Sequence, residues 1–233
     1  MWTLYRKELS YYFNNPIGYI ILVLFGLFAN FVYVKDIFVV GSASMRPFFS
    51  VLPWLFLIFI PALSMRIISE EKRTNTIETL LTLPVSETQI VLAKFLALLT
   101  LSGIALLLTL GLPVSVSLLT RLYLPEILVG YLGALLMAAL YISISMFFSA
   151  QTKNQVVAFL LSILVLFLLN VMSTDFVATV LPKLVLDALS YVTPVYHLEN
   201  FIRGVLSLRS IIFFLSFTTA FLLLTIIDLE KRE

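Results

Sequence analysis

The side chains that could take part in acid–base or binding chemistry are few, and they gather between the apolar segments. Of 233 residues, 15 are Lys or Arg and 13 are Asp or Glu, with one histidine and no cysteine. The densest charged cluster contains Glu70, Glu71, Lys72, Arg73 and Glu78. Charges interleaved with apolar residues are typical of the rim of a protein interface. Composition alone is equally consistent with an ordinary solvated loop.

Catalytic motifs are absent from the sequence. Without cysteine, the chain cannot form a disulfide, a thiolate metal site or a thiol nucleophile. It has no Gly-x-Ser-x-Gly elbow and no phosphate-binding P-loop. His197 is the only histidine, and a lone histidine is more often a packing residue than a base or a ligand. We expect no metal or cofactor on this chain, so another polypeptide would have to supply any energy from ATP.

The composition is that of a membrane protein. Hydrophobic residues make up 61% of the chain and charged residues 12%, and the mean hydropathy is +1.08. A soluble domain usually carries about 25% charged residues. A soluble enzyme and a disordered chain are excluded, and a net charge of +2 gives no reason to expect nucleic acid. Uncharged runs long enough to cross a bilayer as helices are 9–34, 47–65, 95–120, 127–152, 154–174 and 210–227.

These runs predict an all-α integral membrane protein with six transmembrane helices in a single domain, residues 1–233. The predicted spans are 17–34, 48–65, 89–118, 127–150, 155–172 and 210–227. An even number of crossings places both termini on one side. If that side is inside, nine basic residues lie on inner segments and six on outer ones. The positive-inside rule then predicts a multi-pass protein of the cytoplasmic membrane with both termini in the cytoplasm.

An amphipathic helix is predicted at residues 2–15, before the first span. Its apolar stripe is rich in aromatic residues, and Lys7 lies on the opposite side. Such a helix suits the membrane interface, where it would lie flat. The alternative is that it extends the first span inward. The residues assigned to the interface helix are Trp2, Tyr5, Arg6, Lys7 and Leu9.

The inner connection, residues 66–88, predicts a short helix within residues 70–83. Asn75 can cap it, and Glu78 follows in a capping-box relation. Pro84 ends it. Its apolar face comprises Ile77, Leu80 and Leu81. The alternative is an ordinary solvated loop whose charges fix the topology.

The outer connection, residues 173–209, is not a plain loop. It contains two largely apolar segments, and Pro182 and Pro194 interrupt them. Each segment is too short to span a bilayer. They predict re-entrant or interfacial helices that dip into the outer leaflet, within residues 175–208 and before the last span.

The stretch SEEKRTNTIETLLTLPVSETQIVLAKFLA resembles the coupling-helix region of ABC-2 type export permeases. Asn75 stands where that family usually has glycine, and asparagine tolerates left-handed geometry. The positions that match the family pattern are Glu70, Glu71, Lys72, Arg73, Thr76, Glu78, Leu80, Leu81, Pro84, Ser86 and Lys94.

A second stretch, TPVYHLENFIRGVLSLRSIIFFLSFTTAFLLLT, is similar to the re-entrant hairpin and last span of the same family. The resemblance covers nearly the whole chain in segment order. Within the family it is closest to the permease subunits of gliding-motility transporters and next to those of nitrous-oxide-reductase maturation. The matching hairpin residues are Pro194, Tyr196, His197, Arg203 and Gly204.

The resemblance implies a non-catalytic half-transporter. Two such chains, identical or related, would pair in the bilayer. Two cytoplasmic ATPase subunits, which hold ATP and Mg, would dock on their coupling helices. The hairpins would guard the outer exit, and an extracytoplasmic accessory protein could join. The implied ATPase-coupling residues are Glu70, Glu71, Lys72, Arg73, Asn75, Thr76, Ile77, Glu78, Leu80, Leu81 and Pro84.

Two function classes follow from this resemblance. The first is a permease subunit that exports an amphiphilic or polymeric substrate. The second is a mechanical transmitter that passes ATPase motion to an extracytoplasmic partner without moving a substrate. An intramembrane enzyme is disfavoured, because no ionisable side chain lies in the middle of the six apolar runs.

Overall fold

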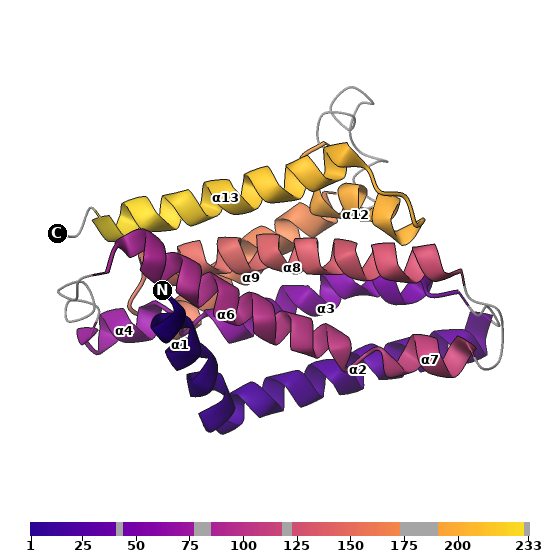
Figure 1. Ribbon diagram of the computed structural model, residues 1–233, viewed down its shortest axis with the longest axis horizontal. Coiled ribbons are helices and arrows are strands. Elements are labelled where there is room, and N and C mark those ends of the chain that lie inside the picture. The colour runs from indigo at the N-terminus through magenta and orange to yellow at the C-terminus, as the bar shows by residue number, and fades with distance from the viewer. Residues whose placement is uncertain (41–43, 77–84, 118–122, 173–190, 231–233) are drawn as a thin grey trace.

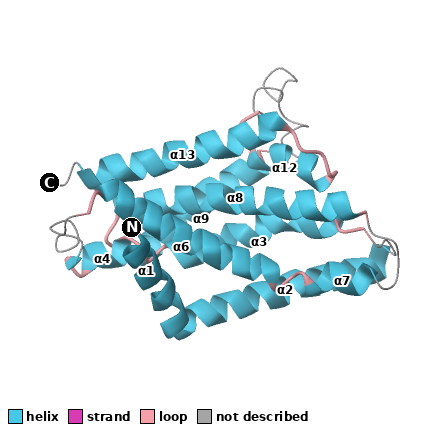
Figure 2. Ribbon diagram, viewed as in Figure 1, coloured by secondary structure: helices cyan, strands magenta, loops and turns pink. Residues whose placement is uncertain are grey.

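The computed structural model describes residues 1–40, 44–76, 85–117, 123–172 and 191–230. Every regular element in these ranges is an α-helix (Figures 1 and 2). The prediction of an all-helical protein is therefore confirmed for this part of the chain. The helices are α1 (Trp2–Asn14), α2 (Pro16–Val40), α3 (Arg46–Ser64), α4 (Ser69–Arg73), α6 (Glu87–Leu107), α7 (Gly111–Ser117), α8 (Leu124–Gln151), α9 (Gln155–Val171), α12 (Pro194–Ile202) and α13 (Leu208–Glu230).

Five helical segments within the described ranges are long and apolar enough to cross a membrane. The predicted span 155–172 corresponds to α9, an apolar helix of 17 residues. Seventeen residues lie at the short end of the range for membrane helices. The count of six crossings therefore stays a prediction. The five segments are Pro16–Lys35, Arg46–Arg73, Glu87–Ser117, Leu124–Gln151 and Leu208–Glu230.

Helix α8 is the centre of the bundle. It packs against α3, α6, α9, α12 and α13, and Figure 1 shows α13 running along one side of it. Two glycines allow this close approach. A Cβ atom on Gly130 would lie 2.4 Å from the Phe49 ring, and one on Gly133 would lie 2.5 Å from Cβ of Phe201. Side chains are absent at these two positions because α3 and α12 occupy the space.

The N-terminal helix is separate from the first span. Asn15 is extended, with φ −106° and ψ 138°, and it divides α1 from α2. The chain then turns sharply, and a Cβ atom on Gly18 would lie 2.2 Å from the carbonyl oxygen of Tyr12. Only glycine fits where the chain passes this close to its own backbone. Figure 1 shows α1, α4 and the C-terminal end of α13 at one end of the bundle, with α7 and α12 toward the other.

The predicted span 89–118 is not one continuous helix. Helix α6 ends at Leu107, and α7 begins at Gly111. Pro113 explains the break, because it has no N–H to donate to the carbonyl oxygen of Thr109 four residues earlier. That carbonyl accepts instead from the N–H of Leu112, at 3.0 Å. At the other end of α6, the Ser86 side chain caps the helix by accepting from the N–H of Gln89.

Candidate functional site

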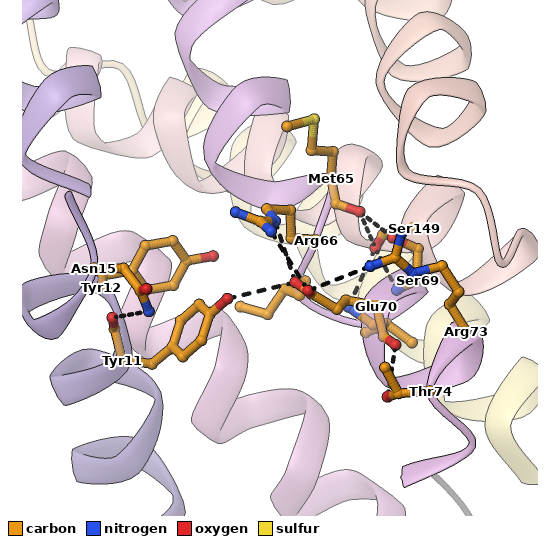
Figure 3. A network of polar contacts seen from close by, with 12 residues as sticks. Tyr11, Tyr12, Asn15, Met65, Arg66, Ser69, Glu70, Arg73, Thr74 and Ser149 are labelled. Atoms are coloured by element: carbon orange, nitrogen blue, oxygen red, sulfur yellow. Dashed lines mark hydrogen bonds and ion pairs between the residues drawn. The ribbon is translucent and has the colours of Figure 1, made fainter. Parts of the chain in front are cut away.

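The corner between α3 and α4 is held by one buried serine from α8. Ser149 accepts hydrogen bonds from the N–H groups of Ile68, at 3.2 Å, and Ser69, at 3.1 Å. Its hydroxyl also lies 3.0 Å from the carbonyl oxygen of Met65, to which it donates (Figure 3). Backbone groups at helix ends lack partners within their own helix. Ser149 satisfies several of them and fixes the direction in which α4 leaves α3.

Lys94, near the start of α6, is the centre of a buried ion-pair cluster. Its ammonium lies 3.0 Å from Oε1 of Glu8 on α1 and 2.8 Å from Oε1 of Glu71 on α4. It also donates to the carbonyl oxygen of Ile67, at 2.9 Å. Only 2% of the Lys94 side chain is exposed. An ammonium has three N–H donors, and here each has an acceptor from a different segment. One lysine therefore joins α1, the α3–α4 corner and α4 to α6.

Lys72, the residue after Glu71, makes the second buried contact of α4. Its ammonium lies 3.1 Å from Oδ2 of Asp228, near the end of α13. It also donates to the carbonyl oxygen of Ala150, at the end of α8. Gln151 donates to the other oxygen of Asp228, at 3.2 Å. Consecutive residues of α4 thus bind opposite parts of the bundle: Glu71 binds α6 and α1 through Lys94, and Lys72 binds α8 and α13.

Glu70 forms a third, more exposed group of contacts. Its carboxylate pairs with Arg66, at 3.1 Å, and with Arg73, at 3.7 Å. The Tyr11 hydroxyl donates to it from α1, at 3.4 Å (Figure 3). Exposed ion pairs contribute little to stability. We expect this group to orient the surface of α4 and the two lysine contacts to hold it in place.

Two tyrosines bind α1 to the spans. The Tyr12 hydroxyl donates to the carbonyl oxygen of Leu63, at 2.7 Å, and the Tyr5 hydroxyl lies 3.0 Å from Thr100 Oγ1. The Leu63 carbonyl oxygen has no donor within the helix, because the N–H of Ile67, four residues later, donates to the carbonyl oxygen of Ser64 instead. Burial raises the pKa of Tyr12 far above its usual value, so the hydroxyl keeps its proton and acts as a donor.

The structure brings together the charged residues predicted for ATPase coupling. Glu70, Glu71, Lys72 and Arg73 all lie on α4. The predicted helix 70–83 is interrupted, however, because α4 ends at Arg73 and Asn75 is left-handed, with φ 55°. A helical residue follows at Thr76. The remaining predicted coupling residues, Ile77, Glu78, Leu80, Leu81 and Pro84, lie outside the described residues.

The predicted interface residues lie on α1 beside this cluster. Trp2 is exposed and stacks on Tyr5, and Arg6 and Lys7 are also exposed. Leu9 packs against the core. Helix α1 therefore presents aromatic and basic side chains outward.

The predicted hairpin residues lie on or beside α12, toward the other end of the bundle (Figure 1). Pro194 begins α12, and buried His197 stacks on Phe213, with ring centroids 4.0 Å apart. Tyr196 and Arg203 are exposed, and Gly204 is left-handed, with φ 76°. These residues do not lie among the charged residues on α4. Of the predicted hairpin, only residues from 191 onward are described.

Sequence reasoning did not identify several residues that contact α4 or its corner, among them Glu8, Tyr11, Arg66, Ser149 and Asp228. A signal for the first was present, because a lysine at the edge of an apolar span needs a partner. Lys94 is such a lysine, but the sequence does not say which carboxylate it meets. In the described part of the chain, no group of three or more His, Asp or Glu residues is placed to hold a metal ion.

An all-helical bundle of apolar spans, with buried ion pairs at one end, defines a multi-pass membrane protein. The family described as ABC-2 family transporter protein matches residues 45–232, which is most of the sequence. The chain therefore belongs to the ABC-2 transporter family and is a transmembrane subunit of an ABC transporter. Membership implies a bilayer environment and an ABC-type ATPase partner. No curated protein matches the sequence.

Proposed function

We propose that this chain is the permease subunit of an ATP-driven exporter, and that ATPase motion enters it through the segment that follows α4. The observation that supports this most is the double attachment of α4. Glu71 pairs with Lys94, and Lys72 pairs with Asp228. A force on the segment after α4 would reach α1 and α6 through the first pair and α8 and α13 through the second.

The contacts of α4 are suited to transmission because they are buried. A solvated ion pair exchanges partners with water at little cost, whereas a buried lysine that leaves its carboxylate becomes an uncompensated charge. Lys94 and Lys72 are each 2% exposed. Helix α4 and the ends of the spans bound to it therefore move together more readily than they separate.

The proposed docking surface combines an apolar anchor with charges around it. Ile77, Leu80 and Leu81 supply the anchor by their spacing in the sequence, and exposed Arg73 lies just before them. Buried apolar anchors carry most of the free energy of an interface, and rim charges mainly steer association. The ATPase would hold ATP and Mg, since this chain has no P-loop.

The proposal also places both termini and residues 66–88 in the cytoplasm, in the cytoplasmic membrane. It includes a second permease chain, identical or related, and an amphiphilic or polymeric substrate that moves outward past α12. The family resemblance supports these points. An extracytoplasmic accessory protein would be an additional partner.

The experiment is purification of the tagged chain from its native membranes in mild detergent. We expect an ABC-type ATPase to co-purify, and ATP hydrolysis to disappear when the P-loop lysine of that ATPase is replaced. A chain that is fully recovered in folded form without any ATPase would contradict the proposal. An ATPase that binds equally well after residues 74–84 are replaced by a Gly/Ser linker would contradict the site of entry.

A further inference from the structure

A cavity of about 310 Å³ lies between α1 and α4, next to the ion-pair cluster. Lys7 and Tyr11 line it from α1, and Arg66, Glu70 and Glu71 line it from the α3–α4 corner and α4. Figure 3 shows Tyr11 reaching from α1 toward Glu70 on α4. The volume is at the lower end of that of small-molecule sites.

One wall of the cavity carries an excess negative charge. Glu8 and Glu71 share the single ammonium of Lys94, so two carboxylates and one cation leave one negative charge uncompensated. Oε2 of Glu71 is buried and has no hydrogen-bond partner among the described residues. A buried carboxylate oxygen without a donor is costly. The oxygen is covered in this structure, so a donor that enters the cavity reaches it only after the Glu71 carboxylate turns toward the cavity.

The opposite charge lies on the other walls. Arg66 lines the cavity beside Glu70, with which it pairs at 3.1 Å, whereas Arg73 lies outside the lining. Lys7 is exposed, and its ammonium pairs with no other described residue. The cavity thus offers a buried acceptor on one side and cationic groups on the other. A ligand with both a positive and a negative group satisfies both sides.

We propose that this cavity binds the phosphoethanolamine headgroup of phosphatidylethanolamine. The primary ammonium would donate to Oε2 of Glu71, and the phosphate would face Lys7 and Arg66. A choline headgroup carries a quaternary ammonium with no N–H, so it cannot supply the missing donor. The amphipathic α1, with exposed Trp2 and Lys7, is suited to the depth at which headgroups lie. The inference rests on α1 being at the membrane interface and does not depend on ATPase coupling.

The test is lipid binding by the full-length chain alone, purified in detergent. Native mass spectrometry would compare phosphatidylethanolamine with its N-methyl, N,N-dimethyl and choline analogues on the same acyl chains. Loss of one charge-assisted hydrogen bond corresponds to about a tenfold change in affinity. We expect the choline lipid to bind about tenfold more weakly than phosphatidylethanolamine. Excess soluble phosphoethanolamine should compete only weakly, because it lacks the anchoring acyl chains.

Variants of the cavity make the test specific. In Glu71→Gln, the amide oxygen can still face Lys94, but an NH₂ group replaces the free acceptor, so the preference for phosphatidylethanolamine should disappear. Lys7→Gln should weaken binding of both lipids, because it removes a phosphate contact and leaves the Lys94 cluster intact. Glu199→Gln, an exposed carboxylate on α12 that pairs with Arg203, is the matched control and should keep the preference.

Several outcomes would overturn the inference. Equal binding of the two lipids by the unmodified chain, with ATPase binding unchanged in Glu71→Gln, would mean that the cavity does not bind the headgroup. A preference that persists in Glu71→Gln would place the lipid elsewhere. Tight binding of free phosphoethanolamine would identify a soluble ligand instead of a lipid. Absence of any lipid preference, together with weaker ATPase binding by Glu71→Gln, would assign the cavity to a basic side chain of the partner protein.

Discussion

Lys72 on α4 forms an ion pair with Asp228 near the end of α13, 156 positions later, with 3.1 Å between Nζ and Oδ2. This contact joins the short helix after the second predicted span to the end of the last one. Both partners are largely buried, with 2% and 17% of their side chains exposed. Helix α4 and the end of the last span therefore meet next to the segment through which we propose that the ATPase acts.

The free energy of this pair can be measured by a double-mutant cycle. Lys72→Met, Asp228→Asn and the double variant should be compared by thermal unfolding in detergent. Because Lys72→Met leaves a mostly buried carboxylate, it should cost about 2 kcal/mol or more. Part of that loss should be recovered in the double variant. The control is the exposed pair Arg203–Glu199, whose coupling should be below about 0.5 kcal/mol. Equal coupling in the two pairs would show that the buried contact does not hold α4.

A single methyl group added at Gly133 of α8 should destabilise the protein. In Gly133→Ala, the new Cβ would lie 2.5 Å from Cβ of Phe201, an atom close to the α12 backbone, so α12 must shift. Overpacking of this kind costs about 1–3 kcal/mol. Gly111→Ala is the control, because nothing lies within 4 Å of its added Cβ. Its melting temperature should be unchanged or higher. A Gly133→Ala protein as stable as the control would contradict the packing of α12 on α8.

Stability should depend on pH through His197. Burial lowers the pKa of His197 below its usual 6.5, and nearby Arg209 acts in the same direction. The unfolded chain then binds a proton at a higher pH than the folded one. The stabilising contribution is present above pH 6.5 and is lost as the pH falls below it. Melting temperatures between pH 7.5 and pH 5 should therefore fall more steeply in the natural protein than in His197→Gln. Parallel curves would mean that His197 does not titrate on unfolding.

The apolar helices were predictable because a bilayer imposes their length and composition. Segments such as Leu124–Gln151 were found from uncharged runs alone. The left-handed Asn75 also agrees with the glycine-like position that the resemblance indicates. The break before α7 could have been predicted from Pro113. It was missed because prolines are tolerated in membrane helices, so the residue alone does not reveal whether the helix ends or only bends.

The ion-pair cluster was not predictable in the same way. Glu8 and Lys94 are 86 positions apart, and Ser149 reaches a corner 80 positions earlier. Helical periodicity reports which residues share a face of one helix, and it carries no information about which helices meet. Lys94, Glu71 and Lys72 were recognised by their types and spacing, but their partners depend on how the spans pack.

The proposed sidedness can be tested with single cysteines, because the natural chain contains none. Thr74→Cys, just after α4, and Leu206→Cys, just before α13, are both exposed positions. In intact cells, a membrane-impermeant maleimide should label Leu206→Cys and should label Thr74→Cys only after lysis. Labelling of Thr74→Cys in intact cells would place α4 outside, where no cytoplasmic ATPase could reach it.

The most direct test of the central claim is the effect of Leu81→Asp on the ATPase complex. Leu81 lies outside the described residues, and its spacing places it on the apolar face that we propose as the ATPase anchor. A carboxylate there would lose its hydration on docking, which costs several kcal/mol. Leu206→Asp is the matched control, an exposed leucine near α12. Membrane insertion should be normal for both variants. We predict at least about tenfold weaker co-purification of the ATPase and loss of permease-dependent ATP hydrolysis for Leu81→Asp alone. A Leu81→Asp chain that inserts normally and keeps both its ATPase and its activity would contradict the account.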